Sequence, residues 1–235
     1  HPCFVIDYGS ASGPPPVTRL GADLTGKGDE RWRNDSTPAS EAPGYGVHFE
    51  NIRFFAPNAS PSTRCSTLVR SQTGMMSFRN CVFNGGGIAS TQVGGMIVEG
   101  CVFRNIDGPA LYTNAQFVLV RDCGFRGMES KAHDYVYIDG DRMDGDNCAL
   151  LSNLTVEGPG SATQTDGDGI RIRNRKWVLM EGCDVSGFDT GVSVGGQVSA
   201  QDLEMPCDDI YLRSNKIHDC ADGLKLDNVE TIRVM

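Results

Sequence analysis

Short segments in which apolar and polar residues alternate recur along the chain, and each segment precedes a repeated phrase. The phrase is clearest as Arg79-Asn80-Cys81-Val82-Phe83, Glu99-Gly100-Cys101-Val102-Phe103 and Arg121-Asp122-Cys123-Gly124-Phe125. Its cysteines are 20 and then 22 residues apart. A repeat of this length predicts a solenoid, in which each turn of the chain packs on the previous one.

Weaker copies extend the series into a ladder of equivalent positions: Ile52, Cys81, Cys101, Cys123, Leu154, Cys183 and Asn215. An alternating apolar pair, such as Met76 and Phe78, lies three to five residues before each ladder position. A period of two predicts a strand. A second short strand follows a glycine, as in Ile170-Arg171-Ile172 after Gly169. Short strands wound and stacked in register predict an all-β fold, a parallel β-helix of about seven to eight coils.

The repeat runs on without an obvious linker, which predicts one domain overall. Residues 1–44 are expected to form an N-terminal strand plus a long Pro/Gly-rich loop, and residues 45–235 the β-helix repeat domain. The last residues resemble the strand of a further coil. We therefore expect the chain to be a segment of a longer protein or to lack its natural cap.

The composition narrows the choice of partners. The chain has 30 acidic and 21 basic residues, a formal charge of −9, and a nucleic-acid partner is therefore not expected, since phosphate binding requires a basic face. No apolar run approaches the roughly 18 residues of a membrane span. An acidic substrate would need local cations or a metal ion to bind this chain.

The nine cysteines fall into two groups. Those on the ladder are interpreted as small buried apolar residues stacked coil on coil. The others are Cys3, Cys65, Cys148, Cys207 and Cys220. Of these, Cys207 and Cys220 could bridge the two ends of one coil, and an odd total leaves at least one cysteine unpaired.

Outward residues at equivalent positions of successive coils should form columns spaced by about 4.8 Å. One predicted column, on the second strand of each coil, is Ser90, Tyr112, Tyr137, Arg171, Ser193 and Lys225. A second column beside it is Asp139, Arg173, Gly195 and Asp227. Aromatic rings next to cations suit stacking on sugars and holding carboxylates. The alternative is an ordinary solvated sheet face of mixed polarity.

Charged residues gather next to these columns. The segment Arg171-Ile172-Arg173-Asn174-Arg175-Lys176 carries four cations, and alternation would direct Arg171 and Arg173 to the same outer face, which predicts a local anion site. Asp166 and Asp168 precede it, and Asp139 begins another acidic loop; closely spaced aspartates beside glycines are suitable ligands for Ca²⁺. Aspartate and glycine also simply form turns. His133, followed by Asp134, is either a general base or part of a surface pair.

The Asn-Cys-x-Phe phrase and the Asp-Gly-Ile/Leu strand openings resemble the single-stranded right-handed parallel β-helix proteins of the pectate lyase-like superfamily, over about residues 45–235. The resemblance implies a secreted, periplasmic or cell-surface protein. Families with this fold include polysaccharide lyases, polygalacturonase-type hydrolases, alginate epimerases and viral tail proteins. The Gly-His-Gly motif of polygalacturonases is absent, and Lys131-Ala132-His133-Asp134 matches the epimerase motif Asp-Pro-His-Asp only at its last two positions.

The resemblance to pectate lyases, which use aspartate-bound calcium and an arginine or lysine base, indicates a lyase that cleaves a uronic-acid-containing polysaccharide by β-elimination. Lys225 or Arg171 would be the base, with Tyr137 stacking on the sugar or donating a proton and His133 a further catalytic candidate. Ca²⁺ would bind Asp166, Asp168 and Asp139. Tyr112, Arg173, Lys176 and Asp227 would bind substrate.

Three alternatives to a lyase stay open from the sequence. The first is a non-catalytic solenoid that binds glycans or has a structural role, as in a tailspike or adhesin. The second is a glycoside hydrolase with paired aspartates, for which Asp166 and Asp168 are the candidates. The third is a uronan epimerase. In every case the expected partner is an acidic polysaccharide or another glycan.

Overall fold

The computed structural model describes residues 4–7, 17–18, 30–34, 46–55, 67–71, 75–90, 94–106, 108–127, 134–140, 147–160, 167–198 and 204–235. All the regular elements within these ranges are β-strands, and none is a helix. This part of the chain accordingly contains no apolar helix of membrane-spanning length. The all-β prediction is confirmed.

The strands form three large parallel sheets. Sheet A contains nine strands: β1 (Phe4–Asp7), β4 (Gly46–Glu50), β7 (Met75–Arg79), β10 (Gly95–Glu99), β13 (Phe117–Arg121), β16 (Cys148–Ser152), β19 (Lys176–Glu181), β24 (Asp208–Arg213) and β27 (Ile232–Val234). Sheet B contains eight: β2 (Val17–Thr18), β5 (Arg53–Phe55), β8 (Val82–Asn84), β11 (Val102–Arg104), β14 (Gly124–Arg126), β17 (Thr155–Glu157), β20 (Asp184–Ser186) and β25 (Lys216–His218).

Sheet C also contains eight strands: β3 (Glu30–Asn34), β6 (Thr67–Ser71), β9 (Gly87–Ser90), β12 (Leu111–Thr113), β15 (Val136–Asp139), β18 (Asp168–Arg173), β21 (Thr190–Gly195) and β26 (Asp222–Asp227). A small antiparallel pair, β22 (Gln197–Val198) with β23 (Glu204–Met205), lies outside these sheets.

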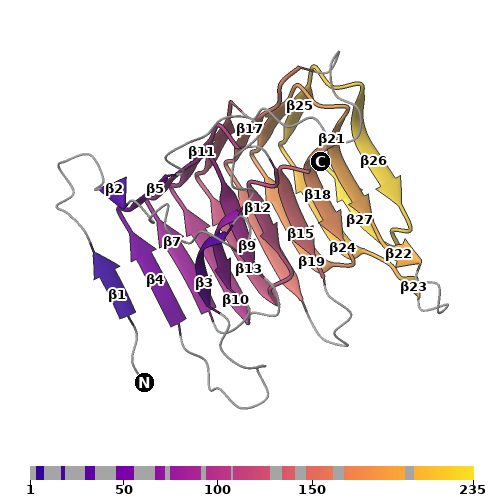
Figure 1. Cartoon of the computed structure of the whole chain (residues 1–235). Coiled ribbons are helices and arrows are strands. Elements are labelled where there is room, and N and C mark those ends of the chain that lie inside the picture. The colour runs from indigo at the N-terminus through magenta and orange to yellow at the C-terminus, as the bar shows by residue number, and fades with distance from the viewer. Residues whose placement is uncertain are drawn as a thin grey trace.

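Each turn of the chain supplies one strand to sheet A, then one to sheet B and one to sheet C, and the next turn pairs with it in parallel. Figure 1 shows the strands side by side in chain order, from indigo to yellow. This arrangement fits a parallel β-helix. The sheets begin before residue 45, because β1, β2 and β3 pair with β4, β5 and β6; the rest of residues 1–44 lies outside the described residues.

The predicted ladder lies in the core between the sheets. Its residues from Ile52 to Cys183 are buried, and Asn215 is half-buried. The Cys81 N–H lies 3.4 Å from Sγ of Cys101, and the Cys101 N–H lies 3.4 Å from Sγ of Cys123. The cysteines therefore stack from turn to turn as predicted, and their thiols are hydrogen-bonding partners of the neighbouring backbone.

Two residues after the cysteines, Phe83, Phe103 and Phe125 form a continuous stack. Successive ring centroids are 4.7 Å apart and the rings are nearly parallel. This distance equals the spacing of neighbouring strands, so a ring on one turn lies directly over the ring of the next. The repeat of Phe in the sequence is thus a repeat of packing contacts.

The residue before each ladder position has a left-handed backbone. Asn80, Gly100 and Asp122 have φ values of 51°, 61° and 54°. Asparagine, aspartate and glycine tolerate this conformation better than other residues, which explains why they precede the cysteines in the repeated phrase. They make the turn from sheet A to sheet B.

The predicted bridge between Cys207 and Cys220 is wrong. Both are free thiols: the Cys207 Sγ accepts the Arg175 N–H at 3.5 Å, and the Cys220 Sγ donates to the His218 carbonyl at 3.2 Å. Cys207 precedes β24, whereas Cys220 lies in the turn from β25 to β26, at another corner of the coil. Cys3 and Cys65 lie outside the described residues.

Candidate functional site

The structure aligns the predicted columns on sheet C. Tyr112 pairs with Tyr137, Tyr137 with Arg171, Arg171 with Ser193 and Ser193 with Lys225. The second column, from Asp139 through Arg173 and Gly195 to Asp227, is also in register. Ser90 is wrongly placed in the first column, because Ala89 is the residue that pairs with Tyr112. Ser90 pairs instead with the buried Thr113.

A groove of about 430 Å³ opens over these columns. Its lining residues are Asp168, Arg171, Ile172, Arg173, Ser193, Val194, Gly195, Gly196, Lys225 and Asp227. Five of them are residues predicted from sequence as site residues: Asp168, Arg171, Arg173, Lys225 and Asp227. The structure therefore brings acidic and basic candidates into one hollow.

The groove is hollow because of the residues of β21. Arg171 on β18 and Lys225 on β26 project on its two sides, and Ser193 between them is too short to fill the space. In the second column Gly195 has no side chain at all. A ligand above β21 would therefore lie between two rows of long, charged side chains.

The strands beside the groove begin with a tight corner. A Cβ atom on Gly169 would lie 2.6 Å from the carbonyl oxygen of Gly191 and 2.7 Å from Cγ1 of Val185. Since real Cβ atoms do not approach other atoms so closely, only glycine fits here. The Asp-Gly opening of β18 thus places Asp168 at the entrance of the strand, next to the groove.

An aspartate that precedes β15 joins two of the groove residues. Asp134 accepts a hydrogen bond from Nη1 of Arg171 at 3.0 Å and one from the backbone N–H of Asp168 at 3.1 Å. Burial lowers the pKa of Arg171, but the charge of Asp134 and its hydrogen bond outweigh this effect and the pKa is raised. The guanidinium therefore keeps its proton and its positive charge beside the groove.

The pKa shift of Asp168 favours its neutral form, whereas that of Arg171 favours its charged form. Burial raises the pKa of its carboxyl group above the usual range, and the charge of Asp134 adds to the increase. A hydrogen bond from the hydroxyl of Ser193 and the positive charges of Arg171 and Lys225 act in the other direction. The net effect of burial is that the Asp168 carboxyl group takes up a proton more readily than an ordinary aspartate.

Tyr137 is held between a cation and an anion. Its hydroxyl donates to Oδ2 of Asp139 at 3.3 Å and accepts from Nη1 of Arg173 at 3.2 Å. Burial raises the pKa of Tyr137, which keeps the phenol protonated. The guanidinium carbon of Arg171 lies 5.4 Å from the Tyr137 ring centroid, within the range of a cation–π contact.

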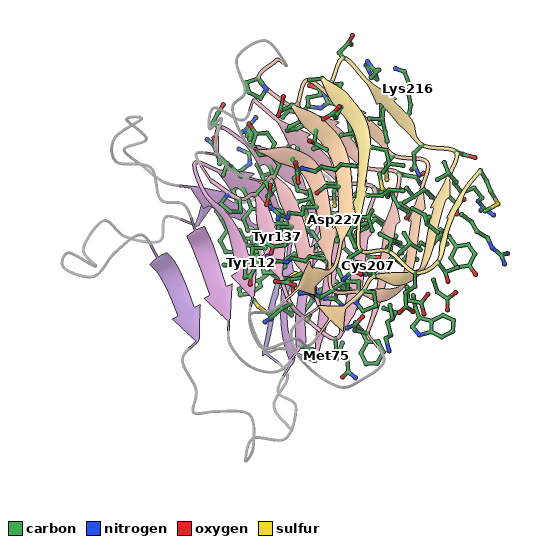
Figure 2. The ribbon with its side chains drawn as sticks, turned by 90° about the vertical axis from the view of Figure 1, so that its right-hand side faces the viewer. Met75, Tyr112, Tyr137, Cys207, Lys216 and Asp227 are labelled. Atoms are coloured by element: carbon green, nitrogen blue, oxygen red, sulfur yellow. The ribbon has the colours of Figure 1, made fainter. Side chains whose placement is uncertain are left out.

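Tyr112 extends this aromatic surface away from the groove. Its ring contacts that of Tyr137 edge to face, with the centroids 5.1 Å apart. Figure 2 shows Tyr112 and Tyr137 next to each other and Asp227 farther along the stack. Two rings therefore continue the line of the groove on one side.

Two of the predicted calcium ligands, Asp139 and Asp168, lie far apart. Asp139 pairs with Arg173, five residues after Asp168 on β18, which separates the two carboxylates by roughly 16 Å along the strand. The Asp139 carboxylate also accepts from Tyr137 and from the Asn174 side chain. Within the described ranges, no group of three or more His, Cys, Asp or Glu side chains is arranged to hold a metal. Asp166 and His133 lie outside the described residues.

The cationic segment does not act as one site. Lys176 begins β19 in sheet A, on another face of the coil from Arg171 and Arg173. The Arg175 side chain is completely buried and donates to the carbonyl oxygens of Ala115, Gln116 and Asp139; burial lowers its pKa to about 10. Only Arg171 and Arg173 face the groove.

Asp134 is the residue that sequence reasoning missed, because it was considered only as the neighbour of His133. Asp134 lies two residues before Val136, and Asp168 lies two residues before Ile170. Val136 and Ile170 pair with each other. Counting back two positions from this pair would have placed the carboxylates of Asp134 and Asp168 at the same level on neighbouring strands.

The chain matches no protein-family model, no curated protein and no solved structure, so comparison with known proteins shows neither its family nor its activity.

Proposed function

We propose that the chain is a right-handed parallel β-helix of the pectate lyase-like kind, secreted or periplasmic, that binds an acidic polysaccharide in the sheet C groove and cleaves it by β-elimination. The main support is the groove itself. A chain with a formal charge of −9 places Arg171, Arg173 and Lys225 around one hollow. With the carboxylates of Asp168 and Asp227 also in the lining, three cations still outnumber two anions, and this positive balance on an acidic protein favours an anionic ligand over a neutral one.

Arg171 and Arg173 would bind the carboxylate of a uronic acid. They lie two residues apart on one strand and face the same groove. Guanidinium groups bind carboxylates with two parallel hydrogen bonds. They would also stabilise the negative charge that develops on this carboxylate when the adjacent carbon loses its proton.

Lys225 would be the base. It faces the two arginines across Ser193 and is exposed at the groove. In the reaction its neutral amine takes the proton next to the carboxylate, the electron pair forms the carbon–carbon double bond, and the glycosidic oxygen departs and is protonated by water or the lysine ammonium. Lys225 is preferred over Arg171 for this role, because the ion pair between Arg171 and Asp134 favours the protonated guanidinium.

In this proposal Tyr137 has no role at the bond on which Lys225 would act. It lies three strand steps from Lys225, roughly 14 Å away. Tyr112 and Tyr137 instead would stack on sugar rings beyond the cleavage point. Their role is thus in substrate binding.

The described residues near the groove do not form a calcium site. The proposed elimination steps involve only side chains of the protein and water. A site with Asp166 and Asp168 stays a prediction, because Asp166 is outside the described residues. Ca²⁺ at that place would add positive charge next to Arg171.

The test is the appearance of unsaturated uronide products, by absorbance, on pectate, alginate and glucuronan substrates, with calcium and with a chelator. Lys225→Ala should remove at least about 99% of turnover if the lysine is the base. Lys216→Ala is the matched control, since Lys216 is also exposed but lies on sheet B. Full activity of Lys225→Ala would refute the assignment, and binding without cleavage on every substrate would favour a non-catalytic glycan-binding solenoid.

Hydrolysis is the second candidate, favoured by the adjacent carboxylates of Asp134 and Asp168. Asp134 is paired with Arg171, whereas burial raises the pKa of Asp168. Two neighbouring carboxyl groups in different environments are typical of glycosidases. New reducing ends without an unsaturated product, lost in Asp168→Asn, would establish hydrolysis and exclude the lyase.

A further inference from the structure

The outer face of sheet A is apolar over much of its area. Its central column consists of Ile97, Leu119, Leu150, Leu179 and Tyr211, one from each of five successive strands. These side chains line a shallow groove of about 570 Å³ that contains almost no polar group. Figure 2 shows Met75, another lining residue, apart from the Tyr112 to Asp227 side of the molecule.

A second outward column flanks the first. Phe117 on β13 pairs with Cys148 on β16, and Trp177 on β19 follows at the same level, since Ala149 pairs with Val178. Phe117 is 53% exposed and Trp177 is 54% exposed. Trp177 also has a positive φ of 57°, which is unfavourable for so large a side chain.

The third outward column, at the strand ends, is charged. From β10 to β24 it contains Glu99, Arg121, Ser152, Glu181 and Arg213. Glu99 already contacts Arg121, and Glu181 contacts Arg213 at 2.5 Å. The order of charges is therefore negative, positive, neutral, negative and positive.

All three columns are self-complementary about β16, the middle one of the five strands from β10 to β24 that carry them. A two-fold axis parallel to β16 would place β13 over β19 and β10 over β24 of a second copy. Arg121 would face Glu181 of the partner subunit, Glu99 would face Arg213 of the partner subunit, and Phe117 would face Trp177 of the partner subunit. Such a surface, matched to itself by one rotation, is what an isologous dimer requires.

The size of the face is also adequate. With the axis over β16, the seven strands from β7 to β27 lie opposite those of the second copy. At about 4.8 Å apart and about 16 Å long they give roughly 540 Å² on each partner, or about 1,100 Å² in total, just above the roughly 1,000 Å² expected of a specific interface. The apolar columns form one contiguous patch on this face, and large contiguous apolar patches are rarely left exposed on monomers. An apolar centre with charges along one side also matches the anatomy of known interfaces.

From these observations we propose that two copies of this chain associate through the outer faces of their A sheets, with the two-fold axis over β16. The sheets pack face to face about 10 Å apart, as in aligned β-sandwiches. The sheet C groove lies on another side of each coil and stays accessible in the dimer. This interface does not depend on the activity proposed for that groove.

Sedimentation velocity over a range of protein concentrations tests the proposal. The wild type should be a dimer, and Leu150→Glu should raise the dissociation constant at least about 100-fold, because two carboxylates would meet near the axis in an apolar environment. Val102→Glu is the matched control: Val102 is a similarly exposed apolar residue on sheet B, and this variant should remain dimeric. A monomeric wild type, or a dimeric Leu150→Glu variant, would overturn the proposal.

Cys148 tests the position of the axis. It is a free, half-buried cysteine on β16, so the two Cys148 thiols of a dimer should lie near each other across the sheet gap. In a short bis-maleimide each of the two rings adds one thiol, so the reagent should link the two Cys148 residues into a covalent dimer. This dimer should be lost in both Cys148→Ser and Leu150→Glu. Association without cross-linking at Cys148 would refute the axis over β16. A monomer that binds an apolar dye at Leu150 would show that the face receives a small ligand instead.

Discussion

Arg171 donates a hydrogen bond from Nη1 to Oδ2 of Asp134 at 3.0 Å, across the step from one turn of the chain to the next. Asp134 also accepts the backbone N–H of Asp168. The single carboxylate of Asp134 thus holds both the guanidinium of Arg171 and the backbone at the start of β18. The groove is therefore shaped by a residue that does not line it.

Removing this cation should weaken the binding of acidic glycans. Arg171→Gln is expected to lower the affinity for an acidic oligosaccharide by about tenfold to 100-fold, because a charged hydrogen bond is worth roughly 1.5 to 3 kcal/mol. Isothermal titration calorimetry measures the loss. Arg126→Gln is the control, since Arg126 is exposed on sheet B and contacts Glu157. Equal losses in both variants would mean that the groove has no special role.

Replacing Asp168 should stabilise the protein at neutral pH. Its pKa is raised by burial in the folded state, so the stability it contributes is present below its unfolded pKa, about 3.9, and is lost as the pH rises through the folded pKa. Asp168→Asn should therefore unfold at a higher temperature than the wild type at pH 7, with a smaller difference near pH 4. Circular dichroism melts at both pH values provide the test; a lower melting temperature at pH 7 would contradict it.

Much of the fold and part of the site followed from the sequence because both depend on the same repeat. Once the ladder at Cys81, Cys101 and Cys123 is counted, the strand period fixes which residues stack, and the columns through Arg171 and Arg173 result. Ser90 was misplaced by one residue, because the short strand that contains it offers few apolar positions to set the count.

Features that depend on the turns did not follow from the sequence. Arg171 and Arg173 share the groove face as alternation predicts, but the corner after Asn174 turns Arg175 into the core and Lys176, expected to bind substrate, onto sheet A. The turn directions decide these positions, and alternation along a strand does not predict them. Asp134 differs from these, because counting back two positions along the paired strands β15 and β18 places it beside Asp168.

His218 should make stability depend on pH near neutrality. Hydrogen bonds to Asp219, at 2.7 Å, and to Asp184, at 2.9 Å, raise the pKa of His218. Its contribution is fully present below the unfolded pKa, about 6.5, and is lost as the pH rises through the folded pKa. Urea unfolding from pH 5 to 9 should show this decline in the wild type and a flatter profile in His218→Gln. An unchanged profile would show that the two carboxylates do not hold the charged imidazole.

The phenylalanine stack gives the last prediction. Phe103 lies between Phe83 and Phe125, with both centroid distances at 4.7 Å, and it is fully buried. Phe103→Ala should lower the free energy of unfolding by about 3 to 5 kcal/mol, through lost burial and the cavity left behind. Val102→Ala, at the exposed neighbouring position, should change it by less than about 1 kcal/mol. Denaturant titration measures both.

The same stack makes the effects of two substitutions interdependent. Since each ring packs mainly on its neighbours in a solenoid, Phe103→Ala removes a contact that Phe125→Ala would also remove. The double variant should therefore lose less stability than the sum of the single variants, by roughly 0.5 to 1.5 kcal/mol for the shared ring contact. Strict additivity in the titration would mean that the two rings contribute through burial alone, and that their stacking from turn to turn adds nothing.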